Sequence, residues 1–343
     1  MASKLVYLNL SFNHINGTLQ NFPAPLSTID LSSNLFQGTI PVSLSNAKFI
    51  DLSRNKFTRF RSFFCKLTDK IKFLDISYNM LTGRFPDCRM DWIALYILNL
   101  ESNNLSGILP VSLSSLNNIR TLRLSNNSFS GMIPLLQNCT GLQFLDLGNN
   151  KLSGNIPTWI GQSLENLQVI RLRSNKLNGS MPSNLCSLSN LKILDLSLNH
   201  ISGEIPPCIQ NLTSMAYREQ LYVDSAFILD FGIPSSFGHE RYFYLSSEDK
   251  ALLMWKGIEY RYETIPQQLR MIDLSYETSH PPSHSAGVKS DFEDGGLWFD
   301  VLWFYIELLQ CVKYSGKVTT PGEGIQIQVA QTIGKLEIYS FKL

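Results

Sequence analysis

Leu191-Lys-Ile-Leu194-Asp-Leu196-Ser-Leu-Asn199 carries the pattern that decides the fold of most of the chain. Side chains alternate along an extended strand, so Leu194 and Leu196 point to the same side, into a core. Leu191 and Asn199 turn inward where the chain enters and leaves that strand. A buried asparagine is stable here because its amide can donate to and accept from the backbone of the turn and of the next coil. The stretch therefore predicts one short strand with a closed, apolar inner side.

The same phrase, L-x-x-L-x-L-x-x-N, recurs along the first two-thirds of the chain. Its closing asparagines lie 21 to 25 residues apart and are Asn13, Asn34, Asn55, Asn79, Asn103, Asn127, Asn150, Asn175 and Asn199. This phrase and this period are the signature of leucine-rich repeats, whose coils stack because none can bury its apolar edge alone. We predict an α/β solenoid of nine coils over residues 1–222. Each coil should contribute one parallel strand, from Leu8–Leu10 to Leu194–Leu196, with loops and short helical turns on the convex side.

A second phrase, G-x-I-P, follows the asparagine in most coils, as in Gly203-Glu-Ile-Pro206. Glycine permits a sharp turn after the strand, and proline then fixes φ where no strand donor is needed. The combined pattern resembles the plant extracellular leucine-rich repeat. The segments LDLGNNKLSGNIPTWIGQSLENLQVIRLRSN, LKILDLSLNHISGEIPPCIQNLTSM and WKGIEYRYETIPQQLRMIDLS together resemble plant receptor-like proteins, most closely those of the fungal ethylene-inducing xylanase receptor type.

That resemblance implies a domain plan. Family members have a signal peptide, a cysteine-bearing N-terminal cap, many repeats, an island, further repeats, one membrane helix and a short tail without a kinase. Here the chain starts inside the array, with no signal peptide or N-terminal cap as written. An aromatic-rich, island-like insert is expected at 223–268, the start of an abandoned tenth repeat at 269–275, and a poorly ordered tail outside the family pattern at 276–343. The apolar stretch 296–311 is short for a membrane helix and contains Asp300 and Glu307.

Composition and motifs exclude several function classes. With 29 basic and 28 acidic residues, the net charge of +1 favours neither nucleic acid nor an anionic membrane surface as a partner. There is no nucleophile elbow, phosphate-binding glycine loop, zinc-protease motif or kinase signature. His280 and His284 are separated by two prolines and cannot share a helical face. We therefore expect a protein that is not an enzyme and binds no cofactor or metal.

Four cysteines fall into two pairs on neighbouring coils. Cys65 and Cys88 are 23 residues apart, and Cys186 and Cys208 are 22 apart. Adjacent coils lie about 5 Å apart, which suits the Cα separation of a disulfide. We predict both disulfides in a secreted chain. The alternative is four free thiols on the convex side. Cys139 occupies an inward position and is expected to be a buried free thiol.

Seven N-x-S/T sequons suggest a secreted surface. The glycosylation sites favoured by their positions are Asn16, Asn104, Asn178 and Asn211.

The outward strand positions define a concave face on which a ligand could lie. Most carry repeated aspartates and serines, but a basic and aromatic group interrupts them. Arginine and aromatic residues are enriched in binding hot spots. The predicted ligand-binding residues are Tyr96, Arg120, Arg123, Phe144, Arg171 and Arg173. An acidic protein or peptide is the expected counterpart, because arginine can bind a carboxylate through two hydrogen bonds. The alternative is a solvated face with no partner.

Two functions fit these observations. The resemblance implies the ligand-recognition part of a plant immune receptor at the extracellular side of the plasma membrane. Such a receptor would bind a microbial elicitor protein or peptide and would signal through co-receptor kinases. The second is a soluble decoy or inhibitor of a secreted microbial glycanase, and a truncated copy without function is a further alternative. The island-like insert favours the first.

Overall fold

The computed structural model describes residues 6–19, 26–88, 92–212 and 214. Farther along the chain it describes the segments 226–229, 243–246, 251–255, 258–262, 271–274, 331–332 and 335–336. The coils are numbered below from one to nine by their asparagines, from Asn13 to Asn199.

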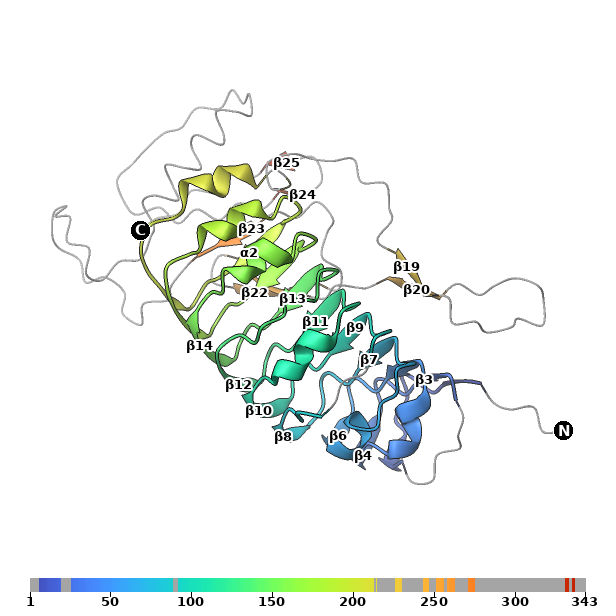
Figure 1. The fold of residues 1–343 in the computed structure, drawn as a ribbon. Helices are drawn as coiled ribbons and strands as arrows, with labels where there is room; N and C mark the ends of the chain where they lie inside the picture. The colour runs from blue at the N-terminus through green and yellow to red at the C-terminus, as the bar shows by residue number, and fades with distance from the viewer. Residues whose placement is uncertain are drawn as a thin grey trace.

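A main sheet of ten parallel strands runs through the array (Figure 1). In spatial order these strands are β1 (Tyr7–Asn9), β3 (Thr28–Asp30), β5 (Phe49–Asp51), β7 (Phe73–Asp75), β9 (Ile97–Asn99), β11 (Thr121–Arg123), β13 (Phe144–Asp146), β15 (Val169–Arg171), β17 (Ile193–Asp195) and β23 (Met271–Asp273). The predicted solenoid with one parallel strand per coil is confirmed. Each strand starts one residue earlier than predicted, because the residue before the first leucine already pairs with its neighbour, as Ile193 does with Val169.

The repeated asparagine connects each coil to the one before it. In coil three, Nδ2 of Asn55 donates to the carbonyl of Leu52 in its own turn and to that of Leu31 in coil two, at 3.2 and 2.9 Å. Its Oδ1 accepts the backbone N–H of Phe36, also in coil two, at 3.0 Å. The sequence predicted these backbone bonds, but toward the next coil. The structure corrects the direction: the carbonyl and the amide that the asparagine side chain binds, Leu31 and Phe36 for Asn55, belong to the preceding coil.

A second set of parallel strands, called the second sheet below, follows the asparagines, where the sequence predicts only a turn. It consists of a sheet of β2 (Asn16–Thr18), β4 (Leu35–Thr39) and β6 (Lys56–Arg59), and another of β8 (Thr82–Arg84), β10 (Asn104–Ile108), β12 (Ser128–Gly131), β14 (Lys151–Asn155), β16 (Lys176–Gly179) and β18 (His200–Ile201). The apolar residue two positions after each asparagine explains these strands. In β14, for example, Leu152 is fully buried while Lys151 beside it is exposed, which is the alternation of a half-buried strand.

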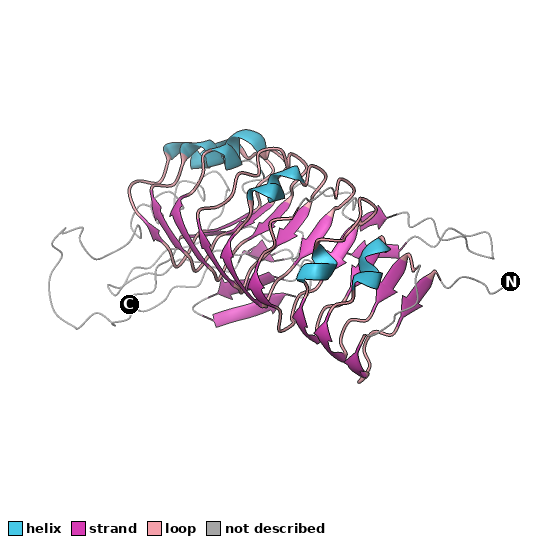
Figure 2. Ribbon diagram, turned by 60° about the horizontal axis from the view of Figure 1, so that its bottom comes forward, coloured by secondary structure: helices cyan, strands magenta, loops and turns pink. Residues whose placement is uncertain are grey.

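Short helical turns complete the convex side, as predicted (Figure 2). They are η1 (Val42–Asn46), α1 (Arg61–Phe64), η2 (Val111–Ser115), α2 (Trp159–Ser163), η3 (Ser183–Ser187) and η4 (Pro207–Asn211). Coils stack closely here. A Cβ at Gly161 in α2 would overlap the backbone carbonyl of Asn184 in η3, so only glycine fits.

The remaining described strands form three antiparallel pairs and one extension of the main sheet. The pairs are β19 (Ala226–Leu229) with β20 (Phe243–Ser246), β21 (Ala251–Trp255) with β22 (Ile258–Tyr262), and β24 (Gln331–Thr332) with β25 (Lys335–Leu336). β23, from the predicted restart of the repeat, pairs in register with β17. The other residues of the predicted insert and tail lie outside the described part of the chain, so these domain boundaries stay predictions.

Candidate functional site

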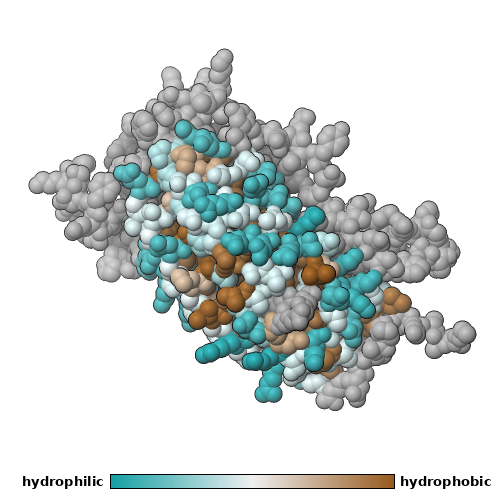
Figure 3. All heavy atoms as spheres, in the orientation of Figure 1, coloured by the Kyte–Doolittle hydropathy of each residue, from teal (hydrophilic) through white to brown (hydrophobic). Residues whose placement is uncertain are grey.

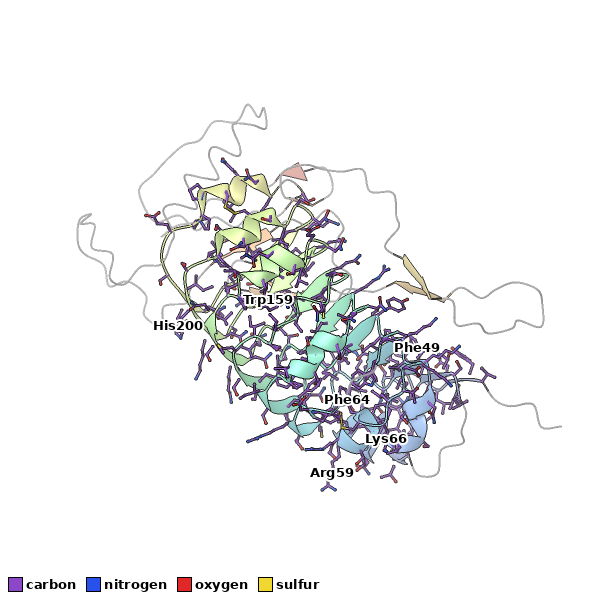
Figure 4. All side chains as sticks on the ribbon, viewed as in Figure 1. Phe49, Arg59, Phe64, Lys66, Trp159 and His200 are labelled. Carbon is purple, nitrogen blue, oxygen red and sulfur yellow. A yellow bond between two sulfur atoms is a disulfide. The ribbon has the colours of Figure 1, made fainter. Side chains whose placement is uncertain are left out.

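The register of the main sheet aligns equivalent residues of successive coils into rows on the concave face. From β3 to β17 the central residue of each strand is buried in the core, as Ile50 and Leu74 are, and its neighbours point outward. Phe49 pairs with Phe73, and Asp51 pairs with Asp75. Equivalent residues pair in the same register through all ten strands of the sheet. Phe49 lies on the main-sheet side of the coils, across from Arg59 of the second sheet (Figure 4). Each row therefore contains one side chain per coil.

One row is purely acidic in coils two to four. Asp30, Asp51 and Asp75 are paired across adjacent strands, and all three are half-buried. Each carboxylate accepts two hydrogen bonds from the serine two residues later; for Asp51, the Ser53 amide and hydroxyl lie at 2.9 and 2.7 Å. Burial, followed by the neighbouring charge of Asp75, raises the pKa of Asp51 to about 8. Burial also raises the pKa of Asp75.

Aromatic side chains accompany this acidic part. The rings of Phe49 and Phe73 are stacked with their centres 4.2 Å apart, in the row beside the aspartates. On the other side, the guanidinium of Arg54 lies 4.6 Å from the ring centre of Tyr78. The Tyr78 hydroxyl donates to Oε1 of Glu101 at 2.9 Å. Coils two to four thus present half-exposed carboxylates, the ring of Tyr78 and one arginine, beside the buried stack of Phe49 and Phe73.

The same row alternates in charge in coils six to nine, where it reads Arg123, Asp146, Arg171 and Asp195. Nη1 of Arg171 donates to Oδ2 of Asp146 at 2.8 Å, and its Nε lies 4.0 Å from Oδ2 of Asp195. Arg171 is 4% exposed and Asp146 1%. This part of the row is an internal ionic ladder.

The structure places the six predicted ligand-binding residues in two groups. Four are buried, and their contacts include Arg173 Nη1 donating to Ser197 Oγ at 2.9 Å and Arg123 lying 4.4 Å from the Phe144 ring centre. Tyr96 and Arg120 remain half-exposed at the start of their strands, with the guanidinium 5.6 Å from the ring centre. Asp146, Arg171 and Asp195 occupy the same position of successive repeats, four residues before the closing asparagine, and this shared position was the signal for the ion pair that the prediction missed.

Both predicted cysteine pairs are bridged in the structure. Cys65 and Cys88 have Cα atoms 5.6 Å apart, and those of Cys186 and Cys208 are 5.7 Å apart. Cys139 is a buried free thiol whose pKa is raised to about 11 by burial. It is therefore protonated and a poor nucleophile.

The asparagines of the four favoured sequons are exposed. Asn16, Asn104 and Asn178 lie on strands of the second sheet, and Asn211 ends η4. Glycans at these positions would leave the concave face open. Glycosylation itself stays a prediction.

Within the described residues, no group of three or more histidine, cysteine or acidic side chains is arranged to hold a metal ion. None of the helices found there has the length and apolar character to cross a bilayer. The histidines at 280 and 284 and the apolar stretch 296–311 lie outside that part of the chain.

Comparisons with known proteins agree with the fold. A leucine-rich-repeat family model matches residues 25–47, 94–116, 118–139, 141–163, 166–188 and 190–212. The receptor-like proteins EIX2 and EIX1 of Solanum lycopersicum are each 41% identical to this chain, over 279 and 276 residues. These matches cover 80% and 79% of the chain but only 27% and 26% of the relatives, so the chain spans about a quarter of their length.

Solved structures of plant receptor kinases have the same coil. The ectodomain of GASSHO1/SCHENGEN3 from Arabidopsis thaliana, bound to CASPARIAN STRIP INTEGRITY FACTOR 2, is 34% identical, with a TM-score of 0.56 over 60% of this chain and 26% of that one. The Arabidopsis receptor kinase HAESA, in complex with the peptide hormone IDA and the co-receptor SERK1, is 33% identical, with a TM-score of 0.56 over 61% of this chain and 36% of that one.

Proposed function

We propose that this chain, a leucine-rich-repeat solenoid similar to plant receptor-like proteins, is the ligand-recognition part of a cell-surface immune receptor. It would bind a microbial elicitor protein or peptide at the extracellular side of the plasma membrane. Signalling would depend on co-receptor kinases, as expected for receptors without a kinase of their own. The observation that carries the proposal is the 41% identity to EIX2 across four-fifths of the chain.

The concave face supports a refined position for the ligand. HAESA, which shares the fold, was solved with a peptide hormone and a co-receptor. In this chain, Asp30, Asp51 and Asp75 of coils two to four are half-exposed on this face, and so are Tyr96 and Arg120. The ionic ladder engages Arg171 with Asp146. We therefore place the ligand contacts on the open part of the face and give Arg123, Phe144, Arg171 and Arg173 a supporting role beneath or beside it.

A binding measurement with a fungal ethylene-inducing xylanase tests this proposal. The chain would be produced by secretion, and binding to a catalytically inactive xylanase would be followed by calorimetry. Replacing Tyr96 and Arg120 together with alanine should weaken binding by about 2 kcal/mol or more, because both belong to residue types that dominate hot spots. Lys56→Ala and Lys151→Ala, both exposed on the second sheet, are matched controls that should bind normally. Absence of binding to the xylanase, or undiminished binding by the double variant, would contradict the proposal.

The inhibitor function is the second candidate, and an enzyme assay separates it from the first. An inhibitor should lower xylanase activity in proportion to the complex formed. A receptor fragment should bind active and inactive xylanase equally and need not change turnover.

A further inference from the structure

The second sheet is interrupted between coils three and four. β6 pairs with β4 in one sheet, and β8 pairs with β10 in the other, but the described residues of β6 and β8 do not pair with each other. Along this part of the boundary, the amide of Met80 donates to the carbonyl of Phe57 at 2.9 Å. A regular boundary, such as that between β14 and β16, has three paired residues at the same level. Coils three and four are therefore less firmly joined on this side than the regular coils are.

Arg59 explains the interruption. The other eight coils have a glycine at this position, four residues after the asparagine, and each of these glycines has a φ between 74° and 109°. Arg59 does not adopt a positive φ, because a Cβ makes that conformation costly. The chain of coil three therefore takes another path: β6 bulges where Arg59 pairs with Thr39, and the chain then enters α1. Arg59 is exposed at the outer edge of the coil, where Figure 4 labels it and Figure 3 shows hydrophilic surface.

Gly83 shows how coil four is left uncovered at this boundary. At the next boundary, a Cβ at Gly107 would lie 3.0 Å from Cγ of Arg84, in the preceding coil. Around Gly83, no atom of the described residues would lie within 4 Å of a Cβ, as around Gly17 in coil one. Thr82, Gly83 and Arg84 of β8 are all exposed. Coil four thus resembles the start of an array on this side, although coil three precedes it.

The other sides of the same boundary are closed. In the main sheet, β5 and β7 pair in register. On the convex side, Phe64 of coil three packs against Phe85 and Trp92 of coil four, with ring centres 5.1 and 4.5 Å apart. The disulfide between Cys65 and Cys88 joins the two segments that follow β6 and β8. Both cysteines are half-buried, so a small reductant can reach the disulfide.

We propose that the boundary between coils three and four is a redox-sensitive hinge, closed while the Cys65–Cys88 disulfide is intact. On reduction, the two coils separate on the side of the second sheet, and the paired strands β5 and β7 form the axis. A dithiol reductant breaks the disulfide in two exchange steps: the reductant closes to its own internal disulfide, and its two protons go to the cysteine sulfurs. Asp51 and Asp75 stand on the two strands of this axis, so the hinge divides the acidic part of the concave face.

Hydrogen exchange of the full chain, followed by mass spectrometry of its peptides, tests the hinge. Peptide 79–85, the hinge peptide, contains Met80, whose N–H donates across the hinge. Peptide 103–109, the control peptide, contains Asn104, whose N–H makes the equivalent bond to the carbonyl of Leu81 at the next boundary, also at 2.9 Å. A local opening of the hinge accelerates exchange in the hinge peptide alone, whereas a loss of stability of the whole array accelerates both.

Replacing Cys65 and Cys88 together with serine should speed exchange of the hinge peptide at least about tenfold and leave the control peptide unchanged. The matched control replaces Cys186 and Cys208 with serine, at a boundary where β16 and β18 remain paired, and should change neither peptide. Reducing the folded chain of this control variant with dithiothreitol should reproduce the effect of the first double variant, so the test does not depend on how well that variant folds. Equal acceleration of both peptides, or no acceleration of the hinge peptide, would overturn the proposal.

Two variants at position 59 test the cause of the hinge. Arg59→Gly lets coil three make the turn of the other coils, so β6 should then pair with β8. In the chain without the Cys65–Cys88 disulfide, Arg59→Gly should slow exchange of the hinge peptide about tenfold. Arg59→Ala removes the same charge but keeps a Cβ, so it should leave this exchange fast. No slowing by Arg59→Gly, or equal slowing by both variants, would reject the hinge as it is proposed.

Discussion

The same row of the concave face has opposite electrostatics in its two parts. Asp30, Asp51 and Asp75 place three acidic side chains on adjacent strands, while Arg123, Asp146, Arg171 and Asp195 alternate between basic and acidic. The repeat geometry is the same in both parts. The alternating part is buried, and Arg171 there lies between the carboxylates of Asp146 and Asp195. The acidic part is half-exposed, and its carboxylates are held mainly by hydrogen bonds from their own turns. The repeat therefore determines the position of a side chain on the face. The residues at the same position one coil away determine whether that side chain is buried in an ion pair or exposed to a ligand.

The largest expected effect comes from breaking the alternating part. Arg171→Met should lower the free energy of unfolding by about 3–5 kcal/mol, because it leaves the buried carboxylates of Asp146 and Asp195 without their guanidinium. Urea denaturation measures the change. A loss below about 1 kcal/mol would show that the ladder is not a buried ionic structure.

The acidic part should make the stability of the chain depend on pH. The pKa of Asp51 rises from 3.8 to about 8 on folding, so the folded state holds a proton that the unfolded state releases. Stability from this proton is complete below about pH 4 and is lost as pH rises through about 8. Asp51→Asn, which needs no proton, should leave stability at pH 4 little changed and raise it above pH 8. Parallel urea curves at the two pH values check this, and an equal effect at both would contradict it.

Copying the alternation into the acidic part sharpens the comparison. Asp51→Arg would place a guanidinium between Asp30 and Asp75, as Arg171 stands between Asp146 and Asp195. At pH 8 it should stabilise the chain by about 1 kcal/mol relative to Asp51→Asn, since both new pairs are half-exposed. If the arginine variant is less stable than the asparagine variant, the charge pattern is not what distinguishes the two parts.

The smallest effect is expected at Arg54, the arginine beside the acidic part. Its guanidinium lies against the half-exposed ring of Tyr78. Arg54→Met should cost about 0.5–1 kcal/mol, the usual contribution of an exposed cation–π contact. The same denaturation assay compares this variant directly with Arg171→Met. Similar losses of stability from the two variants would contradict the distinction between the half-exposed Arg54 and the buried Arg171.

The sequence predicted the parts of the fold that recur at constant phase. The asparagine period located the main strands, and the leucine phrase located the inward side chains, because stacking demands the same residue at the same place in every coil. The second sheet was missed, although the buried Leu152 beside exposed Lys151 carried its period-two signal. The burial of Arg171 and its ion pair with Asp146 were also missed, because they depend on contacts between coils, with a residue 25 positions away in the chain.

The asparagine bonds to the preceding coil give the array a direction. The backbone N–H of Phe36 donates to Oδ1 of Asn55, and that of Phe57 donates to Oδ1 of Asn79. Each of these amides is therefore protected by a side chain of the coil that follows it. Hydrogen exchange at such an amide should consequently report the opening of its C-terminal neighbour and not only of its own coil. Local unfolding that spreads from the C-terminal end should release these amides one coil ahead of the leucine core. Spreading from the N-terminal end should release core and amide together.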